Sequence, residues 1–294
     1  MKNGYTYLSL GTVGIYMLSD GYFEIENPQK ILAPNISSEL FQSELRRLFL
    51  DGADYNAPII VMLIKTETAV ILVDTGEGVH NRKNAGWLLD SLFSVGFRPT
   101  DITHILITHA HQDHIGGILD ENGELNFPTA RYLIVKEEWD FWHANRLDFS
   151  TSCMPTSSYP DGNLQKRIFE RIKNKIDFFV SGDVLFGCIR TKAAPGHTPG
   201  HICFQVFCEG KSIINLVDLV HSPLLIAHPD WGTEWDVNFE IAVKTRKAIL
   251  ETCAKNRALV ASSHLPWPGI GHIGKNGANF TWIPLALHQP HVSI

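Results

Sequence analysis

Apolar and polar residues follow two different periods along this chain, and together they predict a mixture of strands and helices. Residues 5–18 and 57–75 are rich in apolar residues, and the polar sequence KTET divides the second range into two runs, which predicts a hairpin. Residues 37–50 instead place their apolar side chains at helical spacing, with serines available as caps. The chain is therefore expected to begin with strands that at least one helix interrupts.

The same alternation continues to the end of the chain. Further helices are predicted at 85–95, 136–147, 163–176 and 237–255. Further strands are predicted at 101–108, 130–135, near 177–192, and at 201–208, 211–217 and 257–262. Residues 109–117 and 150–162 have the composition of loops. Because strands and helices alternate in both halves without a repeat or a linker, we expect an α/β fold with helices covering sheets, built as one domain over residues 1–294.

Composition narrows the class of protein. The 294 residues are 44% hydrophobic and 19% charged, which is typical of a globular chain. The net charge of −6 weighs against a nucleic-acid partner, because binding to phosphates needs a concentrated basic surface. No apolar run reaches the length of about 18 residues that a transmembrane helix needs, so we expect no membrane partner.

Cysteine usage and the N-terminal residues concern the compartment. Five cysteines without a CxxC spacing fit neither a disulfide framework nor a cysteine zinc site, and we assign them no role. This usage favours a reducing cytosol. The stretch 1–18 has a single basic residue and no small-residue cleavage site after it, so we expect a strand pair and not a signal peptide.

The densest cluster of polar chemistry is the sequence HAHQDH, which directly follows the apolar strand predicted at 101–108. His109 and His111 lie two residues apart, so they point to the same side of an extended segment. Asp113 and His114 come after the chain turns, and they can face a second point. A histidine-rich surface loop is the alternative reading. Burial of such a cluster would cost too much desolvation without a cation, so the sequence favours a metal site.

Three further candidate ligands lie downstream, each near the end of a predicted strand. His197 belongs to the turn-rich sequence APGHTPGH together with His201, Asp218 ends an apolar strand, and His264 follows the strand at 257–262. Each alone has an ordinary explanation as a turn histidine, a capping aspartate or a core histidine. Sites in α/β folds are built at strand ends, and together with the first cluster these residues complete a site for two metals.

Taken as a set, these residues resemble the ligands of the metallo-β-lactamase superfamily. The match consists of HxHxDH at 109–114 followed by a histidine, an aspartate and a histidine, and VDTG at 73–76 looks like the family's structural turn. The resemblance covers nearly the whole chain. It implies an αβ/βα sandwich of two mixed β-sheets flanked by helices.

The resemblance also implies a dinuclear metal centre. It assigns one metal to His109, His111 and His197 and the other to Asp113, His114 and His264, with Asp218 bridging the two. His201 is usually structural in the family. Nitrogen and oxygen ligands without cysteine suit two Zn²⁺ ions, and they leave iron, manganese, cobalt or nickel open.

Two branches of the superfamily fit this chain. Residues 263–273, SHLPWPGIGHI, resemble a segment of methyl-parathion-hydrolase-like enzymes, and LSDG at 18–21 and EEWDFW at 137–142 fit the same group. That group contains N-acyl homoserine lactone lactonases, which usually carry a tyrosine three residues after the bridging aspartate. Here that position is His221, and a histidine can also donate a hydrogen bond to the substrate.

The resemblance therefore implies a hydrolase that opens the lactone ring of N-acyl homoserine lactones, an activity known as quorum quenching. A metal-bridging hydroxide would attack the lactone carbonyl, His221 would stabilise the oxyanion, and Asp113 would pass a proton to the leaving oxygen. The alternative within the same scaffold is a phosphotriesterase or esterase of the methyl-parathion-hydrolase type. A structural zinc site is the alternative outside enzymes, but such sites are closed and mostly rich in cysteine.

An acyl chain needs an apolar groove near the metals. The candidates for its walls are Met17, Phe23, Trp139, Phe141 and Trp142. Ordinary core or dimer packing is the alternative for each of them, because aromatic residues dominate cores and interfaces. The aromatic excess and the resemblance also lead us to expect a homodimer.

Overall fold

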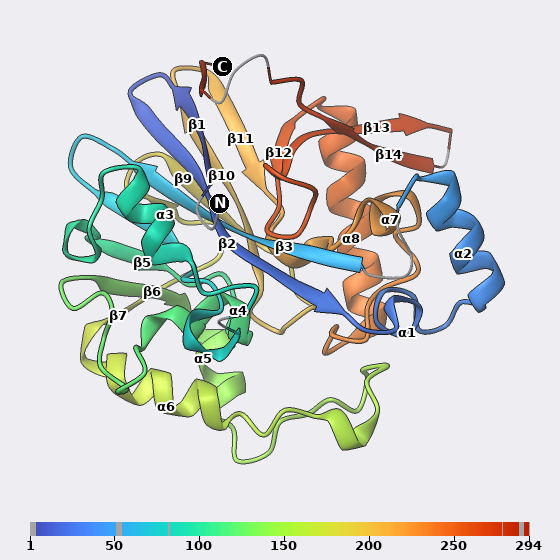
Figure 1. Cartoon of the computed structure of the whole chain (residues 1–294), viewed down its shortest axis with the longest axis horizontal. Coiled ribbons are helices and arrows are strands. Elements are labelled where there is room, and N and C mark those ends of the chain that lie inside the picture. Colours follow the sequence, from blue (N-terminus) through green and yellow to red (C-terminus); the bar gives the residue numbers. More distant parts are fainter. Residues whose placement is uncertain (1–3, 51–54, 82, 278, 288–290, 294) are drawn as a thin grey trace.

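Two β-sheets lie face to face at the centre of the structure, and helices cover both outer sides (Figure 1). The computed structural model describes residues 4–50, 55–81, 83–277, 279–287 and 291–293, so residues 1–3 of the N-terminal stretch lie outside the described part. The sheets are mixed, and the expected αβ/βα sandwich of two mixed β-sheets flanked by helices is confirmed.

The first sheet has eight strands. In spatial order they are β15 (His291–Ser293), β1 (Tyr5–Leu10), β2 (Val13–Ile25), β3 (Tyr55–Lys65), β4 (Val70–Val73), β5 (His104–Leu106), β6 (Arg131–Val135) and β7 (Ile176–Phe179). Strands β1 to β4 pair antiparallel, and β4 to β7 pair parallel. The hairpins expected at 5–18 and 57–75 are both present.

The second sheet has seven strands. In spatial order they are β14 (Asn279–Pro284), β13 (Ile270–Asn276), β12 (Leu259–Ala261), β11 (Lys211–Asn215), β10 (Ile202–Cys208), β9 (Ile189–Ala193) and β8 (Val184–Leu185). Its strands pair antiparallel except β11 and β12, which are parallel. The region expected as strand near 177–192 therefore divides between the two sheets, because β7 belongs to the first and β8 and β9 to the second.

The helices are mostly short. They are α1 (Pro28–Leu32), α2 (Ser38–Arg47), α3 (Leu88–Ser94), α4 (Gln112–Ile115), α5 (Lys136–His143), α6 (Asn163–Ile172), α7 (Pro223–Ala227) and α8 (Phe239–Lys255). Single 3-10 turns are η1 (Gly78–Asn81), η2 (Pro99–Asp101), η3 (Gly116–Ile118), η4 (Thr156–Ser158), η5 (Lys173–Lys175) and η6 (Val217–Leu219). Helix α2 begins after Ser37, whose hydroxyl accepts a hydrogen bond from the backbone N–H of Leu40, as the serines in that range predicted.

Both faces of the first sheet are buried, which explains why its strands are nearly continuous apolar runs. In β3, Ile60, Met62 and Ile64 face the space between the sheets, whereas Val61 and Leu63 face the outer layer. Helices α3, α5 and α6 cover that outer side, and α7 and α8 lie against the second sheet (Figure 1). None of the helices in the described residues is long and apolar enough to cross a membrane.

Several elements were not predicted from the sequence. Helices α1 and α7 have five residues each, which is too short for a helical period to show. The segment expected as a loop at 109–117 contains α4 and most of η3, because the polar ligand residues there mask the helical turn. Strand β13 was missed because glycines interrupt its apolar residues.

The turn after β4 and the segment after α4 are in backbone contact. The N–H of Thr75 donates to the carbonyl of His114 at 2.7 Å, and the N–H of Gly117 donates to the carbonyl of Gly76 at 3.1 Å. A Cβ atom at Gly117 would lie 2.0 Å from the carbonyl oxygen of Thr75. Only glycine at position 117 permits this approach.

We expect Gly117→Ala to lower the free energy of unfolding by about 1–3 kcal/mol or more, because a side chain there forces two backbone segments apart. Urea denaturation measures this. Gly4→Ala is the control, because the nearest atom to its added Cβ is 3.8 Å away. Equal stability of the two variants would contradict the prediction.

Candidate metal centre

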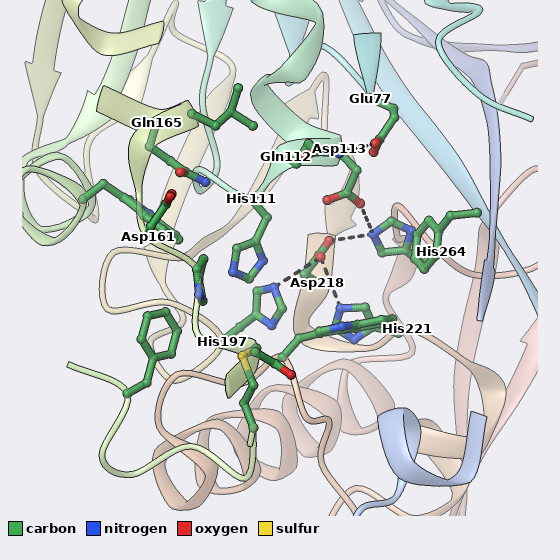
Figure 2. A pocket seen from close by; sticks show the side chains of 18 residues that line it. Glu77, His111, Gln112, Asp113, Asp161, Gln165, His197, Asp218, His221 and His264 are labelled. Atoms are coloured by element: carbon green, nitrogen blue, oxygen red, sulfur yellow. Dashed lines mark hydrogen bonds and ion pairs between the residues drawn. The ribbon is translucent and has the colours of Figure 1, made fainter. Parts of the chain in front are cut away.

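The seven predicted ligand residues come from loops that follow strands of both sheets. His109, His111, Asp113 and His114 follow β5 of the first sheet. His197 follows β9, Asp218 lies in η6 after β11, and His264 follows β12, all in the second sheet. The structure brings all seven side chains together, as Figure 2 shows for those it labels.

These side chains form two groups, and Asp218 belongs to both. The ligand atoms of His109, His111, His197 and Asp218 lie within 4.8 Å of one another, and so do those of Asp113, His114, Asp218 and His264. Each group therefore takes two side chains from the first sheet and two from the second. This is the arrangement of a dinuclear metal site.

The two oxygens of Asp218 face different groups. Its Oδ2 lies 3.3 Å from Nε2 of His197 and 3.6 Å from Nε2 of His109. Its Oδ1 lies 3.2 Å from Nε2 of His114 and 3.3 Å from Nε2 of His264. A carboxylate in this position can bridge two cations.

The buried polar atoms test whether metal ions fit here. Four of the buried side-chain atoms that lack a hydrogen-bond partner are Nε2 of His114, His197 and His264, and Oδ1 of Asp218. Buried polar groups without protein partners are costly, so four of them converging on one place fit a site for metal ions. Burial also holds the pKa of His109 well below its usual value, which keeps that ring neutral and free to bind a cation.

Hydrogen bonds to the far side of each ring fix its orientation. The Nδ1 atom of His114 lies 2.8 Å from Asp74, and Nδ1 of His264 lies 2.8 Å from the carbonyl oxygen of Pro58. The Nδ1 atom of His197 lies 3.1 Å from Asp236. These contacts leave Nε2 of each ring directed at Asp218, as expected for ligands that a second layer of residues holds in place.

A buried ion pair extends this second layer to α8. Arg246 is 1% exposed and donates to Asp236 at 3.0 Å, and Asp236 in turn holds His197. The same guanidinium donates to the carbonyl oxygen of Leu219 at 2.7 Å, directly after Asp218 in the chain. Helix α8 therefore positions a residue from each metal group through one side chain. Sequence analysis missed this pair.

Glu138 of α5 joins two of the ligand loops. Its fully buried carboxylate accepts from the N–H of Ala110 at 2.8 Å, between the first two histidines. It also accepts from the hydroxyl of Thr198 at 2.6 Å and the N–H of Gly200 at 3.0 Å, directly after His197. A fourth bond, at 2.8 Å, comes from the indole N–H of Trp142. Both loops of the first metal group are therefore tied to one carboxylate.

A cavity of about 480 Å³ opens above the two groups. Its lining consists of Phe23, Glu77, His111, Gln112, Asp113, Trp142, Phe149, Met154, Ser158, Pro160, Asp161, Leu164, Gln165, His197, Asp218, His221, Trp235 and His264. Figure 2 shows the metal-group side chains converging at its base. Among these described residues there are four carboxylates and no lysine or arginine. Apart from the metal groups, the lining therefore offers a substrate no lysine or arginine charge.

Two of the five predicted pocket residues line this cavity, namely Phe23 and Trp142. The structure places the other three elsewhere, which corrects the expectation for them. Met17 is 1% exposed and packs between the sheets, because the alternation of β2 turns it inward. The ring of Trp139 stacks on the ring of Phe169 of α6, with 4.6 Å between the ring centroids.

Phe141 is the third of these residues, and it packs edge-on against Phe149 at 5.8 Å. Successive positions on α5 face different sides, so Trp142 lines the pocket while its neighbours do not. Sequence analysis missed most of the apolar wall, which includes Phe149, Met154, Leu164 and Trp235. Met154 belongs to the segment 150–162, which has no helix or strand period, and Phe149 directly precedes it.

His221 lies where the sequence resemblance expected a substrate contact. It lines the cavity, its Nε2 is 3.2 Å from Oδ2 of Asp218, and its ring stacks on His264 at 5.3 Å. Burial lowers the pKa of His221 to about 4, so the ring is neutral near pH 7. His201 lies beside the first group, and its Nδ1 is 2.9 Å from the carbonyl oxygen of Ala194.

A family model of the metallo-beta-lactamase superfamily matches residues 58–264. The chain belongs to this superfamily. An N-acyl homoserine lactonase from Bacillus cereus is 25% identical over 251 residues, which cover 76% of this chain and 88% of the relative. The N-acyl homoserine lactonase AttM from Agrobacterium fabrum is 24% identical over 200 residues, 58% of this chain and 68% of the relative.

One similar solved structure is AidC, described as a dizinc quorum-quenching lactonase in complex with a product, N-hexanoyl-L-homoserine. It superposes with a TM-score of 0.92 at 34% identity and covers 98% of this chain and 99% of its own. The hydrolase AbOPH gives a TM-score of 0.87 at 28% identity, with 97% and 99% covered. Both likenesses extend over the two sheets and their ligand loops.

We expect Glu138→Gln to weaken metal binding by about 10- to 100-fold. The carboxylate accepts hydrogen bonds from both loops, whereas the amide nitrogen of glutamine would face donors with which it cannot form a hydrogen bond. Metal content after dialysis against a graded chelator measures this without any activity assay. Glu137→Gln is the matched control, since Glu137 is its exposed neighbour on α5. Wild-type metal retention in Glu138→Gln would contradict the role of this carboxylate.

Proposed function

We propose that this chain is a dinuclear metal-dependent hydrolase that opens the lactone ring of N-acyl homoserine lactones. The observation that carries the proposal is the pocket, which places two metal-ligand groups beneath apolar walls and has no lysine or arginine among its described lining residues. The likeness to AidC and to curated N-acyl homoserine lactonases supports this substrate class.

The ligand assignment follows the two groups. We propose that one metal is held by His109, His111 and His197 and the other by Asp113, His114 and His264, with Asp218 bridging them. Zn²⁺ is the proposed metal, because imidazole and carboxylate ligands suit it and AidC is described as a dizinc enzyme. When bound, two such ions lower the pKa of water from 15.7 to about 7 and polarise a carbonyl oxygen.

The remaining chemistry falls to side chains around the pocket. His221, whose neutral ring lines the cavity beside Asp218, donates a hydrogen bond to the lactone carbonyl oxygen and stabilises its charge in the transition state. Asp113, whose side chain is 19% exposed against 3% for Asp218, faces the cavity, accepts the proton that the attacking water loses and passes it to the leaving ring oxygen. Phe23, Trp142 and the other apolar wall residues hold the acyl chain and exclude water.

Charge separates this substrate from several others that metal hydrolases cleave. Nucleic acids and other phosphodiesters carry a negative charge that normally meets lysine or arginine. The described lining residues include four carboxylates and no lysine or arginine, so a neutral lactone fits better. A phosphotriester is also neutral, and the similarity to AbOPH keeps phosphotriester or ester hydrolysis as the alternative.

Domain organisation, compartment and oligomeric state concern the chain as a whole. We propose that residues 1–294 act as one domain in the cytosol, in keeping with five free cysteines. We further propose a homodimer, supported by exposed apolar side chains such as Phe49 and Trp267 on the surface.

We expect the zinc-loaded protein to release protons from N-hexanoyl homoserine lactone, and to stop doing so when the metals are removed. Proton release measured with a pH indicator tests this directly, with methyl parathion alongside as comparator. Hydrolysis of methyl parathion without lactone opening would replace the proposal by the alternative.

We expect His221→Phe to lower kcat about 100-fold or more, because loss of one preorganised donor to a developing oxyanion has an effect of that size. The variant should retain its metal content, since His221 belongs to neither ligand group. Lactone kinetics and metal analysis on the same sample provide both values. An unchanged kcat would remove His221 from the mechanism.

A further inference from the structure

One carboxylate on the wall of the pocket has no role in the mechanism described so far. Four carboxylates line the cavity, and Asp113 and Asp218 belong to the metal groups. Both oxygens of Asp161 accept hydrogen bonds from Asn163, at 2.9 and 2.6 Å, and so fix the start of α6. Glu77 is the carboxylate that remains.

The backbone of Glu77 is held firmly in place. Its N–H donates to the buried carboxylate of Asp20 at 2.8 Å. It lies between Gly76 and Gly78, which have φ angles of +70° and +64°, and a Cβ at Gly78 would lie 2.4 Å from the carbonyl oxygen of Gly116. The position of this side chain is therefore set by the same close backbone contact that shapes the ligand loop.

The two oxygens of Glu77 have different surroundings. Oε1 accepts a hydrogen bond from the side-chain amide of Gln112, which lies between His111 and Asp113. No donor to Oε2 occurs among the described residues, and no lysine or arginine is among the described residues that line the cavity. Glu77 is 7% exposed and borders the pocket near Asp113, as Figure 2 shows. A carboxylate in this position has a free acceptor directed at the substrate space.

The proposed substrate has one group that matches such an acceptor. An N-acyl homoserine lactone carries two carbonyl oxygens, which accept hydrogen bonds, and a single amide N–H next to the ring, which donates. A carboxylate repels carbonyl oxygens but binds an N–H strongly. Phosphotriesters and unsubstituted lactones offer no donor of this kind.

We propose that Glu77 accepts a hydrogen bond from the amide N–H of the substrate and so selects lactones that carry an acylamino group. This inference rests on the proposed lactonase function. Glu77 is a specificity-determining residue in this view, because it contacts the substrate beside the ring and not the bond that breaks.

The test compares two substrates that differ only in this donor, N-hexanoyl homoserine lactone and its N-methyl amide derivative. We expect the wild type to prefer the N–H substrate by about 10- to 100-fold in kcat/KM, the range of a hydrogen bond to a charged group. In Glu77→Leu the preference should largely disappear, and in Glu77→Gln it should be intermediate. Glu77→Gln keeps the size of the side chain, so its change in preference separates the loss of charge from any steric effect of the methyl group.

Two controls make the result specific. Asp161→Asn removes a charge from the same pocket wall, and it should keep the wild-type preference between the two substrates. Metal content should be equal in all variants. The assay is run at a pH of about 8, because burial and then Asp113 raise the pKa of Glu77 to about 7 and the group must be ionised.

Three outcomes would overturn the proposal. If Glu77→Leu kept the wild-type preference for the N–H substrate, another group would have to bind the amide. Loss of metal together with equal slowing of both substrates would make Glu77 a support of the metal centre and not a specificity residue. A wild type that opens neither lactone would instead refute the lactonase function, and the role of Glu77 with it.

Discussion

The centre of this structure depends on the burial of two carboxylates and five imidazoles in one place. Asp218 decides how many cations that cluster needs, because its two oxygens face opposite groups of histidines. A single cation would satisfy one oxygen and leave the buried atoms of the other group without partners. The orientation of the Asp218 carboxylate is therefore the reason that the site needs two metals.

That orientation is maintained by residues that never reach the metals. Asp74, Asp236 and the carbonyl oxygen of Pro58 hold the outer nitrogens of three histidines. Glu138 holds two ligand loops, and Arg246 holds both the backbone after Asp218 and the carboxylate of Asp236. Each of the two side chains connects a helix on an outer face to the metal centre. The outer helices thus contribute to the site by fixing backbone positions, which a loop alone would hold poorly.

The first cluster of candidate ligands and the mixture of strands and helices could be predicted because they leave a local signal, whereas the two-sheet sandwich was expected only from the family resemblance. HxHxDH lies within six residues, and the apolar runs of β3 and β4 show the period of buried strands. Glu138 left no such signal, because KEEWDFWH on α5 has three acidic residues and nothing local shows which of them is buried. Arg246 and Asp236 become partners only through the fold, and the placement of Trp142 in the pocket depends on how α5 rotates against the first sheet.

Each metal group takes half of its ligands from one sheet and half from the other. Metal ions bound there would connect the two sheets. Neither sheet alone has the full ligand set, so tight binding requires that the two sheets have packed together. Folding and metal uptake are then linked by mass action, since a ligand that binds only the assembled form stabilises it by about 2.7 kcal/mol when present at 100 times its dissociation constant. The supply of metal would accordingly set what fraction of newly made chains is in the assembled form.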